Sequence, residues 1–362
     1  MAGVYKLNLD GAYQGKRVWL TGDTGFKGSW MALWLRRMGA EVLGIGLEPE
    51  NVEGPFVRAE LPALIHHETA DIRDAGRMAR LARDFAPEVV FHLAAQALVR
   101  RSYADPVETF DTNVRGTASV LDAIRLAGNS CAVVVVTSDK CYENREQDYA
   151  YRESDPMGGH DPYSASKGCE ELVAASYRSA FFAPGGRVHL ATARAGNVIG
   201  PGDWAADRIV PDAVRAFRAG QKLSVRNPRA VRPWQHVLEP LGGYLRLGQA
   251  LMEQGAEVAE GWNFGPDPSS ARDVGTLAES LCHAWGNGAA WQAEPNPRNP
   301  HEAHLLQLNI EKAGARLGWH PRWDFETTVD RTAAGYQALL AAPDAGAVRR
   351  FMESEISAYE SG

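Results

Sequence analysis

The sequence predicts an α/β fold in which helices cover both faces of a parallel sheet. Short apolar runs, each about the length of a buried strand, alternate with stretches of helical periodicity up to about residue 200. A glycine-rich segment at residues 22–28 lies directly between the first of these runs and the first helical stretch. Glycines in that place are typical of dinucleotide-binding folds, so we expect a Rossmann-type, doubly wound parallel sheet.

The elements of this sheet are expected in a regular order along the chain. The first strand is predicted at residues 17–20. The helix after the glycines is predicted from Ser29 to Met38, because Gly39 provides a C-terminal stop. Another helix is predicted around Val114, since apolar or small side chains recur from it at steps of three and four residues. Further strands are predicted at residues 41–47, 89–93, 132–137, 189–194 and 261–265, with a late helix at 235–252.

The chain after about residue 200 carries more Trp, Pro and Arg and fewer strand–helix units. We expect there a smaller, interleaved C-terminal substrate-binding domain. The segment after Ala341 is polar and is expected to be loosely held. The predicted domains are residues 12–200 for dinucleotide binding, with about 235–265 returning to it, residues 201–234 and 266–345 for the substrate, and a tail at 346–362.

The composition is that of an ordinary soluble globular protein. The net charge of -7 argues against a nucleic-acid binder, which would require a basic face. No apolar run approaches the roughly 20 residues that cross a bilayer, and the first residues lack the apolar core of a signal peptide. The four cysteines show no C-x-x-C spacing and indicate neither a zinc site nor a disulfide framework. We therefore expect a cytoplasmic protein with a small-molecule substrate.

A tyrosine and a lysine four residues apart are the first candidates for chemistry. Tyr163 and Lys167 lie on one face of a predicted helix, where the ammonium is expected to lower the phenol's pKa from about 10. Such a phenolate can take the proton of a sugar hydroxyl while a hydride leaves for a nicotinamide ring. The spacing alone is common by chance, so its weight comes from the glycine-rich segment upstream.

Gly22, Gly25 and Gly28 form a G-x-x-G-x-x-G pattern between strand and helix. Glycine permits a tight turn and lets backbone N–H groups approach a pyrophosphate at the positive end of the helix. The spacing differs from the G-x-G-x-x-G of many dehydrogenases. It resembles the extended short-chain dehydrogenase/reductase family, many of whose members act on nucleotide sugars.

Other matches to this family follow in order along the chain. Asp71 and Ile72 stand where the family holds the adenine ring, and Asn113 matches an asparagine that bends a helix. Residues 92–96 match a stretch beside the cofactor ribose and phosphates, and residues 194–200 match the segment that lines the nicotinamide. The resemblance thus implies NAD as the cofactor, bound by Gly22, Thr24, Gly25, Phe26, Gly28, Asp71, Ile72, Leu93, Ala94, Ala95, Gln96, Asn113, Thr137, Tyr163, Lys167 and Arg194.

One position departs from the NAD-specific pattern. Many relatives place an acid at the end of the second strand to hold the adenosine ribose. Here Gly46 stands at that position, and Glu48 comes two residues later. The choice of NAD over NADP therefore rests on the resemblance, and we expect modest, exchangeable NAD binding.

Residues after the strand at 132–137 narrow the resemblance to the nucleotide-sugar 4,6-dehydratases. These enzymes oxidise C4 of a hexose, remove the C5 proton, eliminate the C6 hydroxyl and return the same hydride to C6. Elimination requires an acid and a base that an epimerase does not need. The dTDP-glucose branch has an Asp-Glu pair here, whereas this chain has Asp139 followed by Lys140.

Longer motifs resemble those of the CDP-glucose 4,6-dehydratase branch, over about residues 16–325. They lie at residues 21–30, 137–142, 156–164, 194–200, 202–204, 227–228 and 232–237. The resemblance implies conversion of CDP-D-glucose to CDP-4-dehydro-6-deoxy-D-glucose and water, in deoxysugar biosynthesis such as that of lipopolysaccharide O-antigen. The alternatives are a nucleotide-sugar 4-epimerase, a dehydratase for another nucleotide hexose and a non-catalytic dinucleotide-sensing protein. The last could lose Tyr163, Lys167 or Asp139, and this chain has all three.

The resemblance also implies a role for each catalytic residue. Asp139 would protonate the leaving 6-hydroxyl, Tyr163 would act as base at O4, and Lys167 would hold the cofactor ribose. Ser138 would hydrogen-bond to the sugar 4-oxygen. Lys140 has two alternative roles: if neutral it can take the C5 proton, and if charged it stabilises an enolate while another group takes that proton.

Basic side chains after residue 200 are candidates for binding the substrate diphosphate, because arginine forks match phosphate oxygens. Arg226, Arg229 and Arg232 lie in one segment, although a solvated basic face is the alternative for the first two. Arg232 and Asn197 match family segments that contact the substrate phosphates. The candidate substrate-binding residues are Gln96, Asn197, Arg208, Arg226, Arg232, His236 and His301.

No metal site is expected. His301 and His304 stand three residues apart, not four as in H-E-x-x-H. The resemblance also implies a homodimer, in which helices beginning near Asn113 and Tyr163 pair with their copies in a four-helix bundle.

Overall fold

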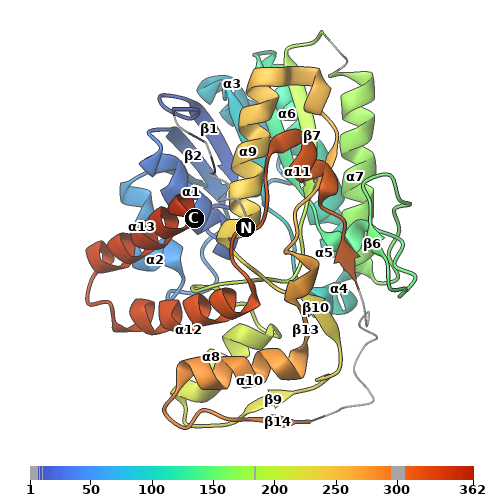
Figure 1. Cartoon of the computed structure of the whole chain (residues 1–362). Coiled ribbons are helices and arrows are strands. Elements are labelled where there is room, and N and C mark those ends of the chain that lie inside the picture. The colour runs from blue at the N-terminus through green and yellow to red at the C-terminus, as the bar shows by residue number, and fades with distance from the viewer. Residues whose placement is uncertain (1–6, 8, 10, 183–184, 295–305) are drawn as a thin grey trace.

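The structure, a computed structural model, describes residues 7, 9, 11–182, 185–294 and 306–362. Within these residues lies a seven-stranded parallel sheet of order β12-β7-β5-β4-β1-β2-β3 (Figure 1). This arrangement confirms the predicted Rossmann-type α/β fold. The strands are β1 Arg17–Thr21, β2 Glu41–Gly46, β3 His66–Thr69, β4 Val89–His92, β5 Cys131–Val136, β7 Val188–Arg194 and β12 Gly261–Asn263.

Strands at the centre of the sheet are buried on both faces, as their continuous apolar sequences predict. Every residue of β4 and β5 is buried. The edge strand β3 escapes the sequence prediction, because its residues from His66 to Thr69 are all polar and only partly covered. It is a strand because its backbone pairs with β2, and its sequence has no apolar pattern that would predict this.

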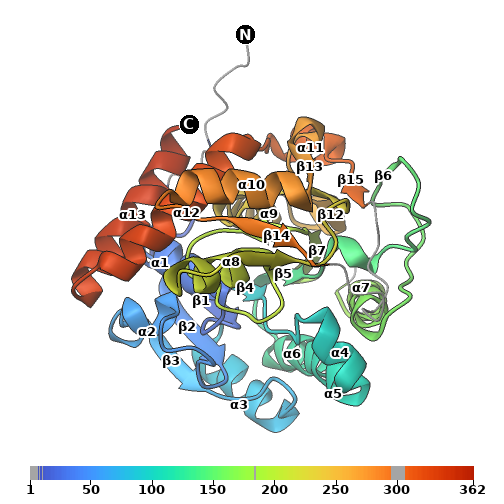
Figure 2. The same cartoon turned by 90° about the horizontal axis from the view of Figure 1, so that it is seen from below.

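Helices cover both faces of the sheet (Figure 2). On one face pack α1 (Phe26–Arg37) and α9 (Leu238–Gln254). On the other pack α3 (Ala75–Phe85), α6 (Gly116–Ala127) and α7 (Pro162–Ala180). The sheet is therefore doubly wound, with its apolar strands shielded from water on both sides.

Two predicted helix starts are wrong. Helix α1 begins at Phe26 and not at Ser29, because Gly25 in the glycine-rich turn already provides its N-cap. Helix α9 begins at Leu238 and not at residue 235, because Gln235–His236 forms the short strand β11, which pairs with β8.

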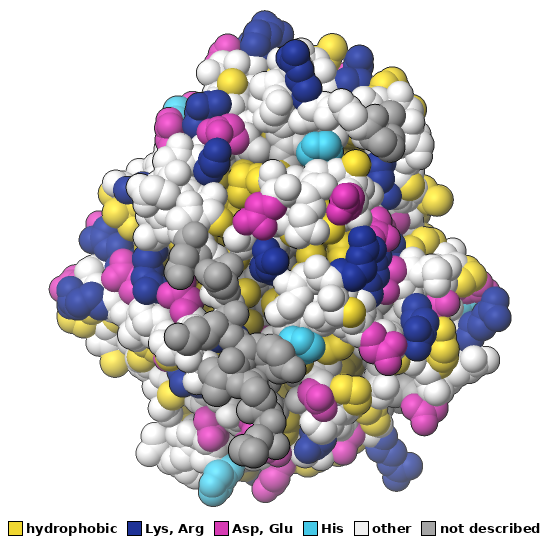
Figure 3. Space-filling view, turned by 45° about the horizontal axis from the view of Figure 1, so that its top comes forward, with side chains coloured by type: hydrophobic (Ala, Val, Ile, Leu, Met, Phe, Trp, Pro, Cys, Tyr) yellow, Lys and Arg dark blue, Asp and Glu magenta, His cyan; other side chains and the backbone are white. Residues whose placement is uncertain are grey.

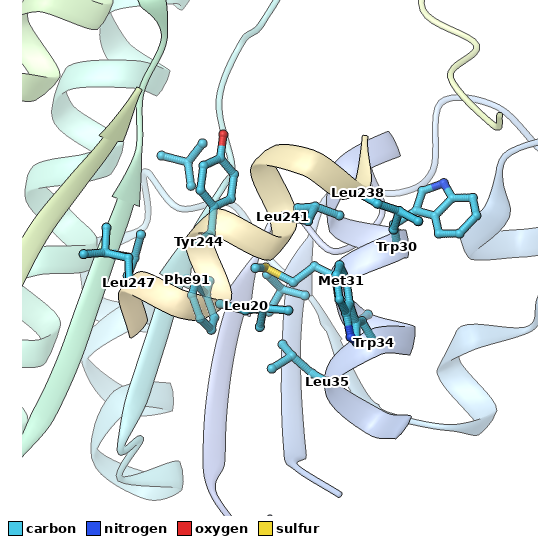
Figure 4. Close-up of a cluster of buried hydrophobic side chains, with 14 of the residues drawn as sticks. Leu20, Trp30, Met31, Trp34, Leu35, Phe91, Leu238, Leu241, Tyr244 and Leu247 are labelled. Atoms are coloured by element: carbon cyan, nitrogen blue, oxygen red, sulfur yellow. The ribbon is translucent and has the colours of Figure 1, made fainter. Parts of the chain in front are cut away.

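The core between the sheet and helices α1 and α9 is dense and aromatic (Figure 4). Leu20 and Phe91 of the sheet, Met31 and Trp34 of α1, and Tyr244 of α9 are all fully buried in it. Large aromatic side chains bury about 150–250 Å² each and dominate the energetics of such a core. This packing fixes α1 on the sheet, and with it the glycine-rich turn between β1 and α1.

A smaller core lies beyond the carboxyl edge of the sheet, in the lower half of Figure 1. Val210, Trp234, Leu277 and Tyr336 are among its buried side chains. Because β12 and α9 belong to the main sheet, the chain passes between the two parts more than once. The predicted domain boundaries stay a prediction. The elements of this part are α8 Ile209–Arg218, α10 Val274–Trp285, α12 Phe325–Ala341, β8 Val198–Ile199, β9 Leu223–Val225, β10 Val231–Pro233, β11 Gln235–His236, β13 Ala271–Asp273 and β14 Trp291–Ala293.

The C-terminal segment is a packed helix, so the expectation of a loosely held tail is wrong. Helix α13 (Ala345–Ser361) buries Met352 and Tyr359 completely and packs against α1. The Tyr359 ring meets the Trp34 ring edge-on at 5.8 Å, and the Trp34 indole donates to Glu360 at 2.8 Å. The polar composition hides an apolar stripe at helical spacing.

Both signs of charge are interspersed on the face shown in Figure 3. That pattern differs from the single basic face of nucleic-acid binders. Among the described helices, none has the length and apolar character to span a bilayer.

Short elements complete the described part of the chain. They are α2 Pro55–Arg58, η1 Leu61–Ala63, α4 Val99–Ala104, α5 Pro106–Phe110, the π-helical turn η2 Asp111–Arg115, η3 Asp139–Cys141, β6 Ala150–Tyr151, η4 Gly255–Val258, η5 Pro268–Ser270, β15 Gln307–Leu308 and α11 Glu311–Leu317.

Candidate active site

A cavity of about 960 Å³ lies between the carboxyl edge of the sheet and the smaller core. Ligands of doubly wound sheets bind at this edge, and the volume suits a ligand of nucleotide size. The two parts of the chain therefore contribute to one site. Predicted site residues that line the cavity are Phe26, Ser138, Asp139, Lys140, Tyr163, Asn197, Arg208, Arg226 and Arg232.

The glycine-rich turn follows β1 at this edge. Gly22 has a φ of +78°, and a Cβ atom there would lie 2.8 Å from the Ala94 nitrogen. A Cβ atom on Gly28 would lie 2.0 Å from the Gly22 carbonyl oxygen. Glycine is thus required at both positions. The first-turn N–H groups of α1, which starts after Gly25, have no partners within the helix, so the turn can bind a phosphate.

Asp23 lies inside this turn, and the position of its carboxylate could not be predicted from the sequence. It is fully buried, and its Oδ2 lies 2.7 Å from Nδ1 of His67 on β3. A Cβ atom on Gly46 would lie 2.7 Å from Asp23 Oδ1, and one on Gly44 would lie 2.1 Å from Oδ2. An acid therefore stands over the end of β2, where Gly46 replaces the acid of many NAD-binding relatives.

The loop after β4 is fixed by two buried side chains. His92 lies between the hydroxyls of Thr21 and Thr117, at 2.6 and 3.0 Å, and burial lowers its pKa to about 3. Asn113, in the π-turn η2, accepts from the Gln96 N–H at 2.8 Å and donates to the Gln96 carbonyl at 3.0 Å. The loop of Leu93, Ala94, Ala95 and Gln96 is thereby held beside Gly22.

Tyr163 and Lys167 lie in the first turns of α7, which Asp161 caps by accepting from the Ser164 N–H at 2.9 Å. The Tyr163 side chain lies close to that of Ser138. Burial raises the pKa of Tyr163 above its ordinary value, although Lys167 and Ser138 lower it. Lys167 thus lowers the phenol pKa as expected, but burial outweighs the ammonium and leaves the pKa above its ordinary value.

Asp139 follows β5 and is almost completely buried. The Ser138 hydroxyl donates to its Oδ1 at 2.9 Å, and the Asn197 amide donates to its Oδ2 at 3.3 Å. A Cβ atom on Gly196 would overlap the Asp139 carboxylate, so glycine is required opposite it. Lys140 is adjacent and lines the same cavity.

Thr137 and Arg194, predicted to bind the cofactor, instead share a buried carboxylate. The Arg194 guanidinium donates to both oxygens of Glu171, at 2.8 and 2.9 Å, and the Thr137 hydroxyl donates to the same carboxylate at 2.6 Å. Similarly, Asp71 accepts three hydrogen bonds from the Arg73 guanidinium, and Ile72 packs in the core. Their contacts with a cofactor stay predictions.

Three arginines line the cavity, and two of them are paired with acids. Arg208 donates to Asp203 at 2.9 Å, and Arg226 donates to Asp207 at 2.8 Å. Arg232 also lines the cavity. These guanidinium groups are candidates to bind a diphosphate.

Two other predicted substrate contacts, His236 and Gln96, do not line the cavity. His236 is fully buried against the Trp323 ring at 4.8 Å, and burial lowers its pKa to about 3. The Gln96 amide donates to Thr109 at 2.8 Å. His301 lies outside the described residues. Roles of these three residues in substrate binding stay predictions.

Sequence reasoning missed several cavity residues. Lys27, inside the glycine-rich turn, lines the cavity, and burial, followed by Arg208 and Lys167, lowers its pKa to about 8. A lysine among the glycines was the available signal. Arg100 and Asp207 also line the cavity, without a motif that marks them, and so does Asp203, which lies in the motif at residues 202–204.

The comparisons with known proteins agree with this geometry. Residues 20–332 match the family model described as GDP-mannose 4,6 dehydratase. A CDP-glucose 4,6-dehydratase from Salmonella typhimurium is 49% identical, over 92% of this chain and 93% of its own length. A dTDP-glucose 4,6-dehydratase from Streptomyces antibioticus is 30% identical over 81% of this chain and 79% of its own.

Among solved structures, a dTDP-glucose 4,6-dehydratase from Streptomyces venezuelae with NAD bound has a TM-score of 0.76 and 25% identity. The match covers 89% of this chain and 97% of that one. A UDP-glucose 4-epimerase from Thermotoga maritima has a TM-score of 0.77 at 22% identity, over 90% and 99% of the two chains, and shares the fold. By the family match and the identity to its relatives, this chain belongs to the nucleotide-sugar 4,6-dehydratase family.

Proposed function

We propose that this protein is a CDP-glucose 4,6-dehydratase, which converts CDP-D-glucose to CDP-4-dehydro-6-deoxy-D-glucose and water. The observation that carries the proposal is the position of Asp139 and Lys140 in the cavity wall with Tyr163. An epimerase would use the tyrosine but needs no acid for a departing hydroxyl. The 49% identity to the Salmonella enzyme supports a cytidine nucleotide.

NAD fits the residues present. The turn from Gly22 to Gly28 forms a phosphate cradle that side chains would fill. Asp23 Oδ1 is buried without a hydrogen-bond partner among the described residues, so it suits a ribose hydroxyl over Gly46. When bound, NAD supplies the reversible hydride acceptor that the sugar chemistry requires. We expect dialysis to remove it; one NAD retained per chain would contradict modest binding.

Each polar group of the site has a task. Tyr163 takes the proton of the sugar 4-hydroxyl, and Ser138, which lies close to Tyr163, contacts the 4-oxygen. Asp139 protonates the departing 6-hydroxyl and is oriented by Ser138 and Asn197. Either Lys140 or Lys27 removes the C5 proton. Positioned acids and bases of this kind contribute about 10²- to 10⁴-fold to a rate.

The proposed function is tested with CDP-glucose that carries deuterium at C4. A dehydratase transfers that label to the new methyl group at C6 without external reductant. The product is followed by its absorbance in alkali at about 320 nm, as expected of an enolised ketone. A label that washes out, or that remains at C4, would exclude the reaction.

Lys27→Met should slow exchange of the C5 hydrogen with solvent more than Lys140→Met does. A lysine acts as a base only when neutral, and burial lowers the pKa of Lys27 to about 8. Its neutral fraction is therefore about a tenth at pH 7 and about a half at pH 8. In the unaltered protein, exchange should rise as the pH increases through about 8. The measurement is deuterium incorporation at C5 in heavy water.

The two methionine variants are controls for each other, because both remove one ammonium from the same cavity. Exchange that survives in Lys27→Met but is lost in Lys140→Met would assign the base to Lys140.

Arg232→Ala should raise the KM for CDP-glucose by about tenfold or more and change kcat much less. The guanidinium is expected to bind the diphosphate equally in the ground state and the transition state, so its loss weakens uniform binding. Steady-state kinetics measure both constants. Arg246→Ala, which removes a partly buried guanidinium remote from the cavity lining, is the control. An unchanged KM in Arg232→Ala would contradict the role.

We further propose that the enzyme is a cytoplasmic homodimer that acts in deoxysugar synthesis, such as that of O-antigen. Support for the dimer comes from apolar side chains on α6 and α7 that remain open to solvent, with Leu126 56% and Leu172 63% exposed. Pairing of these helices across a four-helix bundle would cover such residues. Sedimentation analysis that finds a monomer would contradict the dimer.

A further inference from the structure

Lys167 forms a buried ion pair with Glu170, a residue that none of the sequence motifs includes. Its ammonium donates to both carboxylate oxygens of Glu170, each at 2.9 Å. The two side chains are only 3% and 2% exposed. A buried pair loses hydration on both charges, so its presence beside the reaction centre is not explained by stability alone.

The pair opposes the two tasks of Lys167. An ammonium has three N–H donors, and two of them are directed at Glu170. The negative charge of Glu170 also acts on Tyr163 in the opposite sense to Lys167, raising the pKa of the phenol in addition to burial. Pairing with Glu170 therefore offsets the charge of Lys167 and leaves it fewer N–H donors for the cofactor and Tyr163.

We propose that Glu170 is a positioning residue that holds the Lys167 ammonium back from the cofactor and from Tyr163. The inference rests on the proposed function, in which Lys167 serves both. Glu170 thereby restrains the affinity for NAD and the ionisation of the catalytic phenol, and its carboxylate makes NAD exchangeable.

Among the other charged and titratable groups near this pair, Asp139 also raises the pKa of Tyr163, although less than Glu170 does. Arg194 on β7 keeps the pKa of Glu171 below its ordinary value in spite of burial. Burial keeps the Cys141 thiol of η3 neutral by raising its pKa, and keeps the His92 imidazole of β4 neutral by lowering its pKa to about 3. Burial raises the pKa of Glu170 itself to about 7, against the effect of Lys167.

The test is Glu170→Gln, which keeps the shape and removes the charge. NAD should bind about tenfold more tightly by calorimetry, since hydrogen bonds from the ammonium become available to the ribose. The rise of kcat/KM with pH that reports Tyr163 should move about one unit lower, because the negative charge that raises the phenol pKa is removed. The same shift should appear in ultraviolet titration of the protein without NAD, taken as the difference from a Tyr163→Phe background.

Glu239→Gln is the matched control. Glu239 is also fully buried, burial raises its pKa to about 7, and it accepts hydrogen bonds from the Arg322 and Trp323 N–H groups at 2.9 and 2.7 Å. It does not line the cavity, so its loss should lower stability without changing NAD affinity.

A folded Glu170→Gln protein with unchanged NAD affinity and an unchanged Tyr163 titration would overturn the inference and leave the pair purely structural. If this variant does not fold, Glu170→Asp keeps the charge but shortens the reach, and should give a smaller change in the same direction. Tighter NAD binding in a protein that makes no 4-keto product would support the role of Glu170 while rejecting the dehydratase.

Discussion

Tyr163→Phe should lower kcat by about 10²- to 10⁴-fold, the contribution of a positioned base. Phenylalanine keeps the ring packed in α7 but removes the hydroxyl that takes the 4-hydroxyl proton. Without that group neither C4 oxidation nor any later step proceeds, so C5 exchange should stop as well. Formation of the 4-keto product and C5 deuteration measure the two effects.

The affinity for NAD should change little in this variant, because Lys167 and the glycine-rich turn are intact. Tyr177→Phe on the same helix is the control, since the Tyr177 hydroxyl donates to the Ala118 carbonyl at 3.3 Å and does not line the cavity. Activity retained in Tyr163→Phe would mean that another group takes the 4-hydroxyl proton.

The pH dependence follows from the raised pKa of Tyr163. The base must be ionised to act, and a raised pKa moves its ionisation to higher pH. Activity that depends on this group should therefore be low below its pKa and increase as pH rises. A bound substrate that excludes the remaining water would also raise the pKa of Tyr163, so activity should still increase with pH.

The fold was predictable because its central strands are apolar along their whole length. In β5 every residue is buried, and local sequence alone identifies such a strand. The strand β3 was not predictable, since its polar residues are ordered by pairing with β2. Helix α13 was missed because average polarity concealed a stripe that only its contact with α1 makes meaningful.

Prediction of the site divides in the same way. Tyr163, Ser138 and Asp139 lie in motifs, and the structure brings them to one cavity. Contacts between distant segments are not marked by any motif in the sequence. Asp23 meets His67 across 44 residues of sequence, so neither residue alone indicates a carboxylate over β2.

The electrostatic balance at Tyr163 also could not be read from spacing. Lys167 at four residues predicts a lowered phenol pKa, but burial and Glu170 oppose it. Glu170 stands three residues after Lys167, a spacing shared by many exposed helical pairs. Only its burial distinguishes it from them.

Asp139→Asn separates elimination from oxidation. The amide cannot protonate the leaving 6-hydroxyl, so formation of the 4-keto-6-deoxy product should fall by about 10²- to 10⁴-fold. Tyr163 and the candidate C5 bases remain, so the C5 hydrogen should continue to exchange with solvent. Exchange without product distinguishes this variant from Tyr163→Phe, in which both should stop.

The amide introduced by Asp139→Asn would also meet the Asn197 amide, which now donates to the Asp139 carboxylate at 3.3 Å. Two facing NH₂ groups repel, so Asn197→Asp in the Asp139→Asn background tests whether lost orientation explains the defect. Orientation alone predicts recovery of product, whereas loss of the acid predicts none. Asp74→Asn, at the N-cap of α3, controls for the substitution itself, because asparagine caps helices equally well. If Asp139→Asn abolished C5 exchange together with product, Asp139 would act before elimination and the assigned acid would be wrong.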